Sequence, residues 1–432
     1  MNGEKKFARN LVDFINESPS PFHVAKNVKY LLEQKGFKEL DLRARCNVEK
    51  FGKYFVKRNN STIVAFVIGD GEIEQEGFKI IGAHTDSPTL KIKPAPEMVV
   101  EKSYVKLNIE VYGNPILNSW LDRPLSMAGR VSFKGENPMY PEEKLLNVHK
   151  PILIIPNLAI HMNRNVNQGV ELNKQKDMLP LLTTVKDEIE KDNYFVNLIA
   201  EQLSVDKEQI NNFEIFLYEY EKGSIIGLND NFISSGKLDD LAMVHAGINA
   251  LMNSCAGKAT NVMVCFDNEE PRSKTKQGAD SLMLRSILER IVFGLGKDKE
   301  DYFRSIYSSF IISSDMAHAL HPNSSEKYDP INKPIINKGP VIKFGANLNF
   351  TTDSDSSTVY ESICGNAGIP VQRFTNRSDI TGGSTIGPIT TTQLDIRSID
   401  IRNPILAMHS IRELGGVLDH YYIEKSFEEF YK

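Results

Sequence analysis

The stretch FKIIGAHTDSP, residues 78–88, joins an apolar run to a histidine and an aspartate. Phe78 to Ala83 predicts a buried strand that ends at His84. Further strands are predicted at 53–58, 61–68, 261–266 and 309–313. Helices are predicted at 5–16, 23–35, 240–253, 281–292, 354–367, 409–414 and 419–431. The SPSPF segment (18–22) predicts a turn because proline blocks a helix. This alternation favours an α/β fold.

Residues 95–232 differ from the segments on either side. Short strand-like runs such as VKLNIEVYG and PILIIPNLAI alternate there with turn residues, and one long charged helix is predicted near 183–203. We therefore predict a β-rich domain at 95–232, inserted into a catalytic domain formed by 1–94 and 233–432.

Composition excludes several classes of protein. The chain has 432 residues, 41% hydrophobic and 25% charged, with a formal net charge of −5. This charge gives no electrostatic reason to expect binding to nucleic acid or an anionic membrane. No apolar stretch approaches the roughly 18 residues of a membrane helix, and the N-terminus lacks the apolar core of a signal peptide. We expect a cytoplasmic protein whose four cysteines are reduced thiols.

Six acidic and imidazole residues stand in the short contexts IIGAHTDSP, GKLDDL, CFDNEEP, ISSDMAHALHPN and AMHSIRE. Several of them follow an apolar run, so they can converge at strand ends although they are far apart in sequence. Two imidazoles with four carboxylates suit a two-zinc hydrolytic site, and also cobalt or manganese. The six residues are His84, Asp239, Glu269, Glu270, Asp315 and His409.

Each motif alone has a simpler explanation. His84 at a strand end is more often structural, and Asp239 before a helix is more often an N-cap. The pair Glu269-Glu270 is more specific, because adjacent buried carboxylates repel unless a metal neutralises them. One of them can then bind metal while the other acts as general base; the alternative is a solvated acidic loop. We predict that His409 opens a helix, whose N-terminus favours a neutral, ligating imidazole.

Taken together, the motifs resemble the M18 family of metallo-aminopeptidases, which includes aspartyl aminopeptidase and vacuolar aminopeptidase I. The resemblance runs nearly from end to end. It is carried by SPSPFH (18–23), GAHTDSPTLKIKP (82–94), WLDRPLSMAGRV (120–131), IPNLAIHMNRNVN (155–167), GKLDDL, FDNEE, QGADS, DMAHALHPN, NKGPVIK (337–343), GGSTIGP and MHSIRE.

The resemblance implies a zinc-peptidase (phosphorylase/hydrolase-like) fold, a sandwich of helices around a mixed sheet. It implies an aminopeptidase (EC 3.4.11 class) with two zinc ions per subunit. It implies His84 and Asp315 on one metal, Glu270 and His409 on the other, and Asp239 bridging both. It implies attack by a metal-bridged hydroxide, with Glu269 as general base and Asp86 supporting His84.

Partners are also implied by the resemblance. The inserted domain would mediate dimerisation, and dimers would build a tetrahedral dodecamer. His161 would reach the active site of a neighbouring subunit. His318 and Lys343 would contact the peptide substrate. Lys343 would favour an acidic N-terminal residue by charge pairing, but relatives that prefer leucine carry the same GPVIK motif, so an apolar residue is the alternative.

The sequence departs from the family pattern at Arg272 and Arg402, where glycine is usual. One interpretation is that both reshape the entrance to the site or the loop after the glutamate pair; the alternative is two surface cations. Two other functions also remain open. A di-metal deacylase would act on N-acyl amino acids instead of free amines, and an inactive assembly scaffold would bind no metal.

Overall fold

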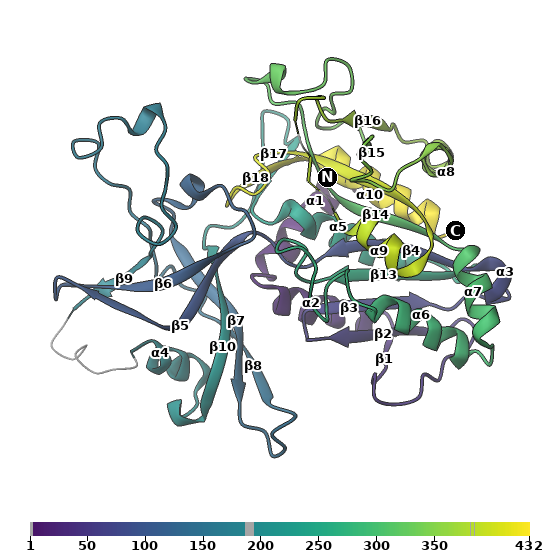
Figure 1. Cartoon of the computed structure of the whole chain (residues 1–432), viewed down its shortest axis with the longest axis horizontal. Helices are drawn as coiled ribbons and strands as arrows, with labels where there is room; N and C mark the ends of the chain where they lie inside the picture. The colour runs from purple at the N-terminus through teal and green to yellow at the C-terminus, as the bar shows by residue number, and fades with distance from the viewer. Residues whose placement is uncertain (1–2, 186–193, 381, 384) are drawn as a thin grey trace. The chain divides into compact units, whose positions relative to one another are not determined.

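The computed structural model describes residues 3–185, 194–380, 382–383 and 385–432 (Figure 1). The chain forms two compact units. Unit 1 comprises Met1–Asp86, Gly223–Met408 and Glu413–Lys432, and unit 2 comprises Ser87–Lys222 and His409–Arg412. The boundaries lie earlier than the predicted 94/95 and 232/233, because strand β5 (Thr89–Val100) pairs within the sheet of unit 2 and β11 (Ser224–Ile226) within that of unit 1.

Unit 1 is built on a mixed sheet of twelve strands. Its main path is β1-β2-β3-β13-β4-β14-β17-β18-β12-β11, and β15 and β16 pair beside β17. Besides β11, its strands are β1 (Lys38–Glu39), β2 (Lys53–Arg58), β3 (Thr62–Val67), β4 (Phe78–His84), β12 (Phe232–Ser235), β13 (Thr260–Phe266), β14 (Phe310–His318), β15 (Val341–Phe344), β16 (Gln372–Thr375), β17 (Arg397–Leu406) and β18 (Glu413–Gly416).

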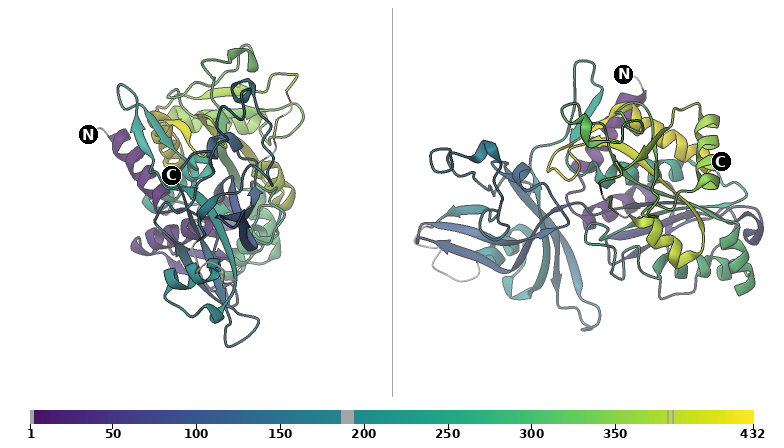
Figure 2. Two further views of the ribbon diagram at one scale, coloured as in Figure 1. Left: turned by 90° about the vertical axis from the view of Figure 1, so that its left-hand side faces the viewer. Right: turned by 45° about the horizontal axis from the view of Figure 1, so that its top comes forward.

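Helices cover both faces of this sheet. They are α1 (Gly3–Asn16), α2 (Pro21–Gln34), α3 (Ile73–Glu76), α5 (Leu238–Asn253), α6 (Met283–Gly294), α7 (Lys299–Tyr307), α8 (Ser354–Ala367), α9 (Ile386–Leu394) and α10 (Val417–Phe430). Helices α1 and α10 pack side by side (Figure 2).

The alternation of side chains along β4 explains the layers. Ile81 packs into the cluster that contains α1, α2, α5, α8 and α10, whereas Ile80 packs into the cluster that contains α6, α7 and α9. Successive strand residues point to opposite faces, so an apolar run can serve both cores. The predicted α/β architecture is confirmed.

In the described part of unit 2, six strands form an antiparallel sheet in the order β8-β7-β10-β5-β6-β9. Besides β5, these strands are β6 (Tyr104–Tyr112), β7 (Leu125–Phe133), β8 (Glu142–Asn147), β9 (Leu181–Thr184) and β10 (Ile210–Glu219). Helix α4 (Tyr194–Leu203) places Phe195 and Ile199 in the core of this unit. The helix predicted at 183–203 is wrong at its start, where β9 forms, and its residues 186–193 lie outside the described part.

Two other local predictions are wrong. The segment 409–414 is not helical: residues 409–412 form a turn, and Glu413 begins β18. In SPSPF, Pro21 is the first residue of α2, a position that tolerates proline because its missing N–H needs no partner there.

Among the residues that the structure describes, no helix is long and apolar enough to cross a membrane.

Candidate metal centre

The candidate site lies at the carboxyl ends of neighbouring parallel strands. Strand β4 runs between β13 and β14 and is parallel to both. His84 is the last residue of β4, Asp315 lies on β14, and Glu269-Glu270 follow β13 after a short turn. Because parallel strands end at the same edge, the fold brings these side chains together.

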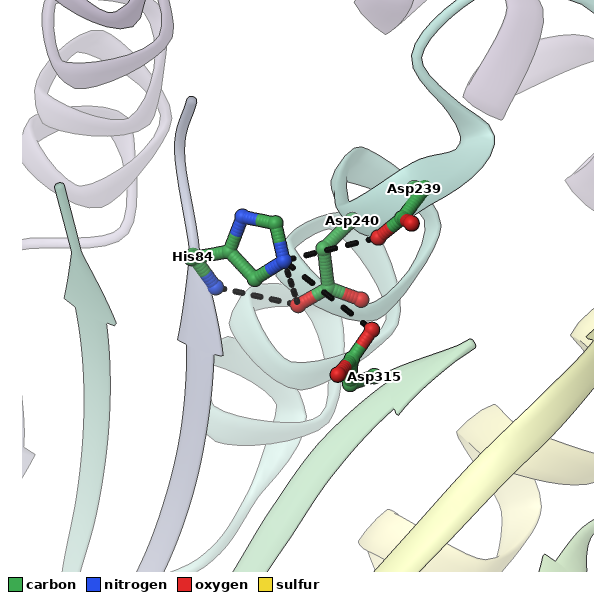
Figure 3. Close-up of side chains that lie close together, drawn as sticks. All are labelled: His84, Asp239, Asp240 and Asp315. Carbon is green, nitrogen blue, oxygen red and sulfur yellow. Dashed lines mark hydrogen bonds and ion pairs between the residues drawn. The ribbon is translucent and has the colours of Figure 1, made fainter. Parts of the chain in front are cut away.

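His84 is at the centre of this group and is 1% exposed. Its Nε2 lies 3.4 Å from Asp239 Oδ1 and 4.0 Å from both Asp240 Oδ2 and Asp315 Oδ1 (Figure 3). Its backbone N–H donates to Asp240 Oδ2 at 3.0 Å. One imidazole nitrogen therefore faces three carboxylates from two elements.

Asp86 connects His84 to the glutamate pair. Its two carboxylate oxygens accept the backbone N–H groups of Glu269 and Glu270, each at 3.1 Å. Its Oδ1 also lies 3.4 Å from His84 Nδ1. A fully buried carboxylate thus fixes the peptide that carries both glutamates and lies beside the imidazole, as a supporting residue of a metal site does.

Asp239 and Asp240 occupy the first turn of α5, where their backbone is not helical and the peptide bond between them is cis. The Asp239 N–H donates to Glu413 Oε2 at 3.1 Å. Asp240 is fully buried, and its Oδ1 has no hydrogen-bond donor among the described residues. A metal role was predicted from the sequence for Asp239 alone, and the contact of Asp240 with His84 was missed.

The electrostatics of the group are dominated by negative charge. Burial, together with the nearby Asp315, Asp86 and Asp239, raises the pKa of Glu269 to about 7 against the opposing effect of His84. Burial also raises the pKa of Asp240 well above its usual range. Burial of His84 disfavours its protonation, but the surrounding carboxylates outweigh this and raise its pKa.

The donor set fits a divalent cation. Two ligand atoms about 2.1 Å from a tetrahedral zinc ion lie about 3.4 Å apart, which is the separation of His84 Nε2 and Asp239 Oδ1. One ligand atom each of His84, Asp239, Asp240 and Asp315 lies within 4.8 Å of the others, and the same holds for His84, Glu269 and Glu270. Carboxylates outnumber cationic side chains in this group, so a bound divalent ion would offset the repulsion between them.

His409 lies in the His409–Arg412 segment, which belongs to unit 2. It occupies the turn between β17 and β18 with a φ of 66°, and Asn114 O lies 3.0 Å from its Nδ1. The predicted helix N-terminus is absent at this residue, so the argument for a neutral imidazole from a helix dipole does not apply.

The other predicted residues lie in different surroundings. His161 is exposed in a turn of unit 2, and His318 is exposed at the end of β14. Lys343 on β15 is buried, with its Nζ 4.9 Å from the ring centre of Phe350 and 5.3 Å from that of Phe374. Burial and the Arg402 charge lower the pKa of Lys343 to about 8.

The two unusual arginines differ from each other. Arg272 is exposed and has a φ of 82°, in the left-handed region. Arg402 is fully buried on β17, where its Nη2 lies 3.1 Å from Asp400 Oδ1 and 3.5 Å from Asp315 Oδ2. The alternative of two surface cations is therefore wrong for Arg402, because carboxylates on β14 and β17 surround it.

Comparison with known proteins identifies the family. The family model of the aminopeptidase I zinc metalloproteases (M18) matches residues 14–431. The chain belongs to the M18 family. This M18 aminopeptidase is 60% identical over 431 residues to the probable M18 family aminopeptidase 2 of Clostridium novyi (strain NT), and the match covers 100% of both chains.

Solved structures agree with this assignment. The chain matches the cryo-EM structure of the Ape4 and Nbr1 complex at 35% identity and a TM-score of 0.95, covering 99% of this chain and 86% of the other. It matches the yeast mApe1 dodecamer at 26% identity and a TM-score of 0.87, covering 99% and 97%. The predicted resemblance is confirmed, and the chain is an aminopeptidase, a metallo-hydrolase of the zinc-dependent M18 family.

Proposed function

We propose that this aminopeptidase removes N-terminal residues from peptides with two zinc ions held by the candidate metal centre, with cobalt or manganese as substitutes. The supporting observation is the meeting of His84 with Asp239, Asp315 and the glutamate pair at one edge of the sheet. Burying this many carboxylates close together costs free energy unless a cation offsets their charge.

The ligands divide between two ions in this proposal. His84 and Asp315 would hold one ion, Glu270 and His409 would hold the other, and Asp239 would contribute to both. The His84–Asp239 distance of 3.4 Å supports the first ion. His409 comes from unit 2, and its assignment rests on the MHSIRE motif.

The chain's own residues then carry the proton transfers. When bound, zinc would activate a water molecule and polarise the peptide carbonyl. Glu269 accepts the proton of the attacking water and delivers it to the leaving nitrogen. Its raised pKa, about 7, suits a group that takes up and releases a proton near neutral pH. Asp86 holds the Glu269 backbone in place for this transfer.

The substrate and the assembly are part of the same proposal. Lys343 would pair with an acidic side chain of the first residue, and His318 would contact the peptide. Unit 2 would mediate dimerisation, and dimers would assemble into a tetrahedral dodecamer in the cytoplasm, with His161 acting across a subunit boundary. The dodecameric structure of a relative at 26% identity supports the assembly.

Metal content and turnover of Asp239→Ala test the two-ion site. Loss of the bridging carboxylate should release both ions and abolish hydrolysis of peptides with a free α-amine. Asp355→Ala, which removes an exposed carboxylate paired with Arg397, is the matched control and should keep both. An Asp239→Ala protein that retains two zinc ions would refute the bridging role.

A further inference from the structure

Arg402 is a fully buried cation beside the candidate metal centre. In the parallel pairing of β14 with β17, its Cα partner is Asp315. Its Nη1 donates to the backbone oxygens of Ser313, at 3.3 Å, and Ile401, at 3.0 Å. Its Nη2 faces Asp400 and Asp315 at 3.1 and 3.5 Å. The guanidinium thus lies between two carboxylates and two carbonyl oxygens.

Asp400 is a rigid anchor for this guanidinium. Besides Arg402, its carboxylate accepts the Ser313 hydroxyl at 2.8 Å, the Thr385 hydroxyl at 2.9 Å, and both the backbone N–H and the hydroxyl of Thr351 at 2.7 and 2.9 Å. Four neutral donors therefore hold Asp400 in place whether or not the arginine is present. The Arg402 guanidinium is therefore held by Asp400 on one side, and its Nη2 faces Asp315 on the other.

The two oxygens of Asp315 are divided between two functions. Oδ2 faces Arg402, while Oδ1 accepts the Met316 N–H and lies 4.0 Å from His84 Nε2. A guanidinium fixes carboxylate orientation because its donors lie in one rigid plane. With Oδ2 held, Oδ1 is the oxygen turned toward the imidazole side of the metal centre.

We propose that Arg402 is a positioning residue that makes Asp315 present a single oxygen to the metal ion, through the chain Asp400–Arg402–Asp315. This proposal rests on the proposed role of Asp315 as a ligand. Asp315 would then offer one oxygen, in one orientation, to a bound ion.

A purely electrostatic role of Arg402 and a positioning role predict different metal affinities when the arginine is replaced. If Arg402 mattered only as a positive charge near the metal, a lysine in its place would leave metal affinity unchanged, and a neutral residue would tighten metal binding. If it positions Asp315, lysine should fail, because an ammonium group cannot hold two carboxylates in one plane.

The test is Arg402→Lys, with Arg397→Lys as the matched control. Arg397 lies on the same strand and pairs with the exposed Asp355. Metal affinity is measured by competition with a chromophoric chelator, and the ligand geometry by the visible absorption of the cobalt-loaded protein. Arg402→Lys should weaken binding at one class of site by about 10- to 100-fold, the usual effect of losing a supporting partner, and should change the cobalt spectrum. Arg397→Lys should do neither.

Two further variants separate the possible failures. Asp315→Ala should empty the same class of site; if it retains full metal, the ligand assignment itself is wrong. If Asp315→Ala loses metal but Arg402→Lys keeps the wild-type affinity and spectrum, the positioning role is wrong and the ligand assignment stands. Asp400→Asn removes the charge that anchors Arg402 and turns an amide nitrogen toward one of its hydrogen-bond donors. It should change the cobalt spectrum in the same direction, and a wild-type spectrum would contradict the Asp400–Arg402–Asp315 chain. Circular dichroism of each metal-free variant verifies that it folds.

Discussion

A buried pair of histidines should make unit 1 sensitive to acid. His245 on α5 and His420 on α10 are 5% and 1% exposed, and His245 Nδ1 lies 3.0 Å from His420 Nε2. Phe7 stacks on His420, with ring centres 4.6 Å apart. Burial lowers the pKa of His245 to about 3, and burial together with His245 lowers the pKa of His420 well below its usual value.

The direction of these pKa shifts decides whether the free energy of unfolding rises or falls as the pH is lowered. Both histidines are neutral in the folded chain, whereas in the unfolded chain each binds a proton below pH 6.5 or so. Their contribution is complete above that pH and is lost as the pH falls toward the folded-state pKa, which is about 3 for His245. Between pH 7 and pH 5, each such histidine lowers the free energy of unfolding by about 2 kcal/mol. The pair lowers it by at most about 4 kcal/mol, because a protonated ring can donate to its neutral partner.

The perturbation is His245→Asn with His420→Gln, which places amide groups near the two facing nitrogens and removes both titrations. Unfolding in urea is followed by circular dichroism at pH 7, 6 and 5, on metal-free protein so that metal release does not contribute. The acid-induced loss of stability should be smaller in the double variant by about 2–4 kcal/mol. Comparison with wild type removes the contribution of other titrating groups to the pH dependence of stability. These groups include Asp419 and Glu424, whose pKa values burial raises to about 7.

An exposed histidine provides the control. His149→Asn in unit 2 keeps a residue that tolerates the local φ of 53° and should leave the pH dependence of stability as in wild type. If wild type and the double variant lose the same free energy between pH 7 and pH 5, the pair is not buried and neutral as described, and the reasoning fails.

Three further predictions concern catalysis. Glu269→Gln should retain metal but lower kcat by ~10² or more, whereas Glu270→Gln should weaken metal binding, and equal metal loss in both variants would contradict the division of roles. Mixed assemblies of His161→Ala and Glu269→Gln subunits should recover activity that neither variant has alone, and their failure to do so would place His161 in its own subunit's site. Lys343→Met should lower turnover of Asp-initiated relative to Leu-initiated peptides, and an unchanged ratio would refute charge pairing.

The sequence predicted those parts of the site that lie on apolar strands. His84 and Asp315 follow runs such as FKIIGA and FIISS, whose hydrophobicity identifies buried strands and therefore a shared edge. His409 lies in a segment with no comparable pattern. Its neighbours in SIREL (410–414) suited a helix locally, but residues 413–416 instead pair with β12 and β17. Tertiary pairing overrode local propensity there.

Arg402 shows a second limit of prediction from the sequence. Its burial depends on Asp315 of another strand and on Asp400, two residues earlier on the same strand. Residues two apart on a strand share a face, so the Asp400–Arg402 pair could be recognised from sequence. The contribution of Asp315 depends on the register of β14 against β17, which no short-range pattern reveals.

The segmentation of the chain has a consequence for its synthesis. Strand β4 pairs with β13 and β14, which are synthesised only after the whole of Ser87–Lys222. Unit 2, which is continuous except for residues 409–412, can therefore fold first. The strands β3 and β4 are made earlier, but they cannot pair with β13 and β14 until those strands have been synthesised. Exposed apolar strand edges of this kind are prone to aggregate. Nascent chains halted near residue 270 should accordingly resist protease across unit 2 and be cut within residues 53–84; uniform resistance of both segments would contradict this order.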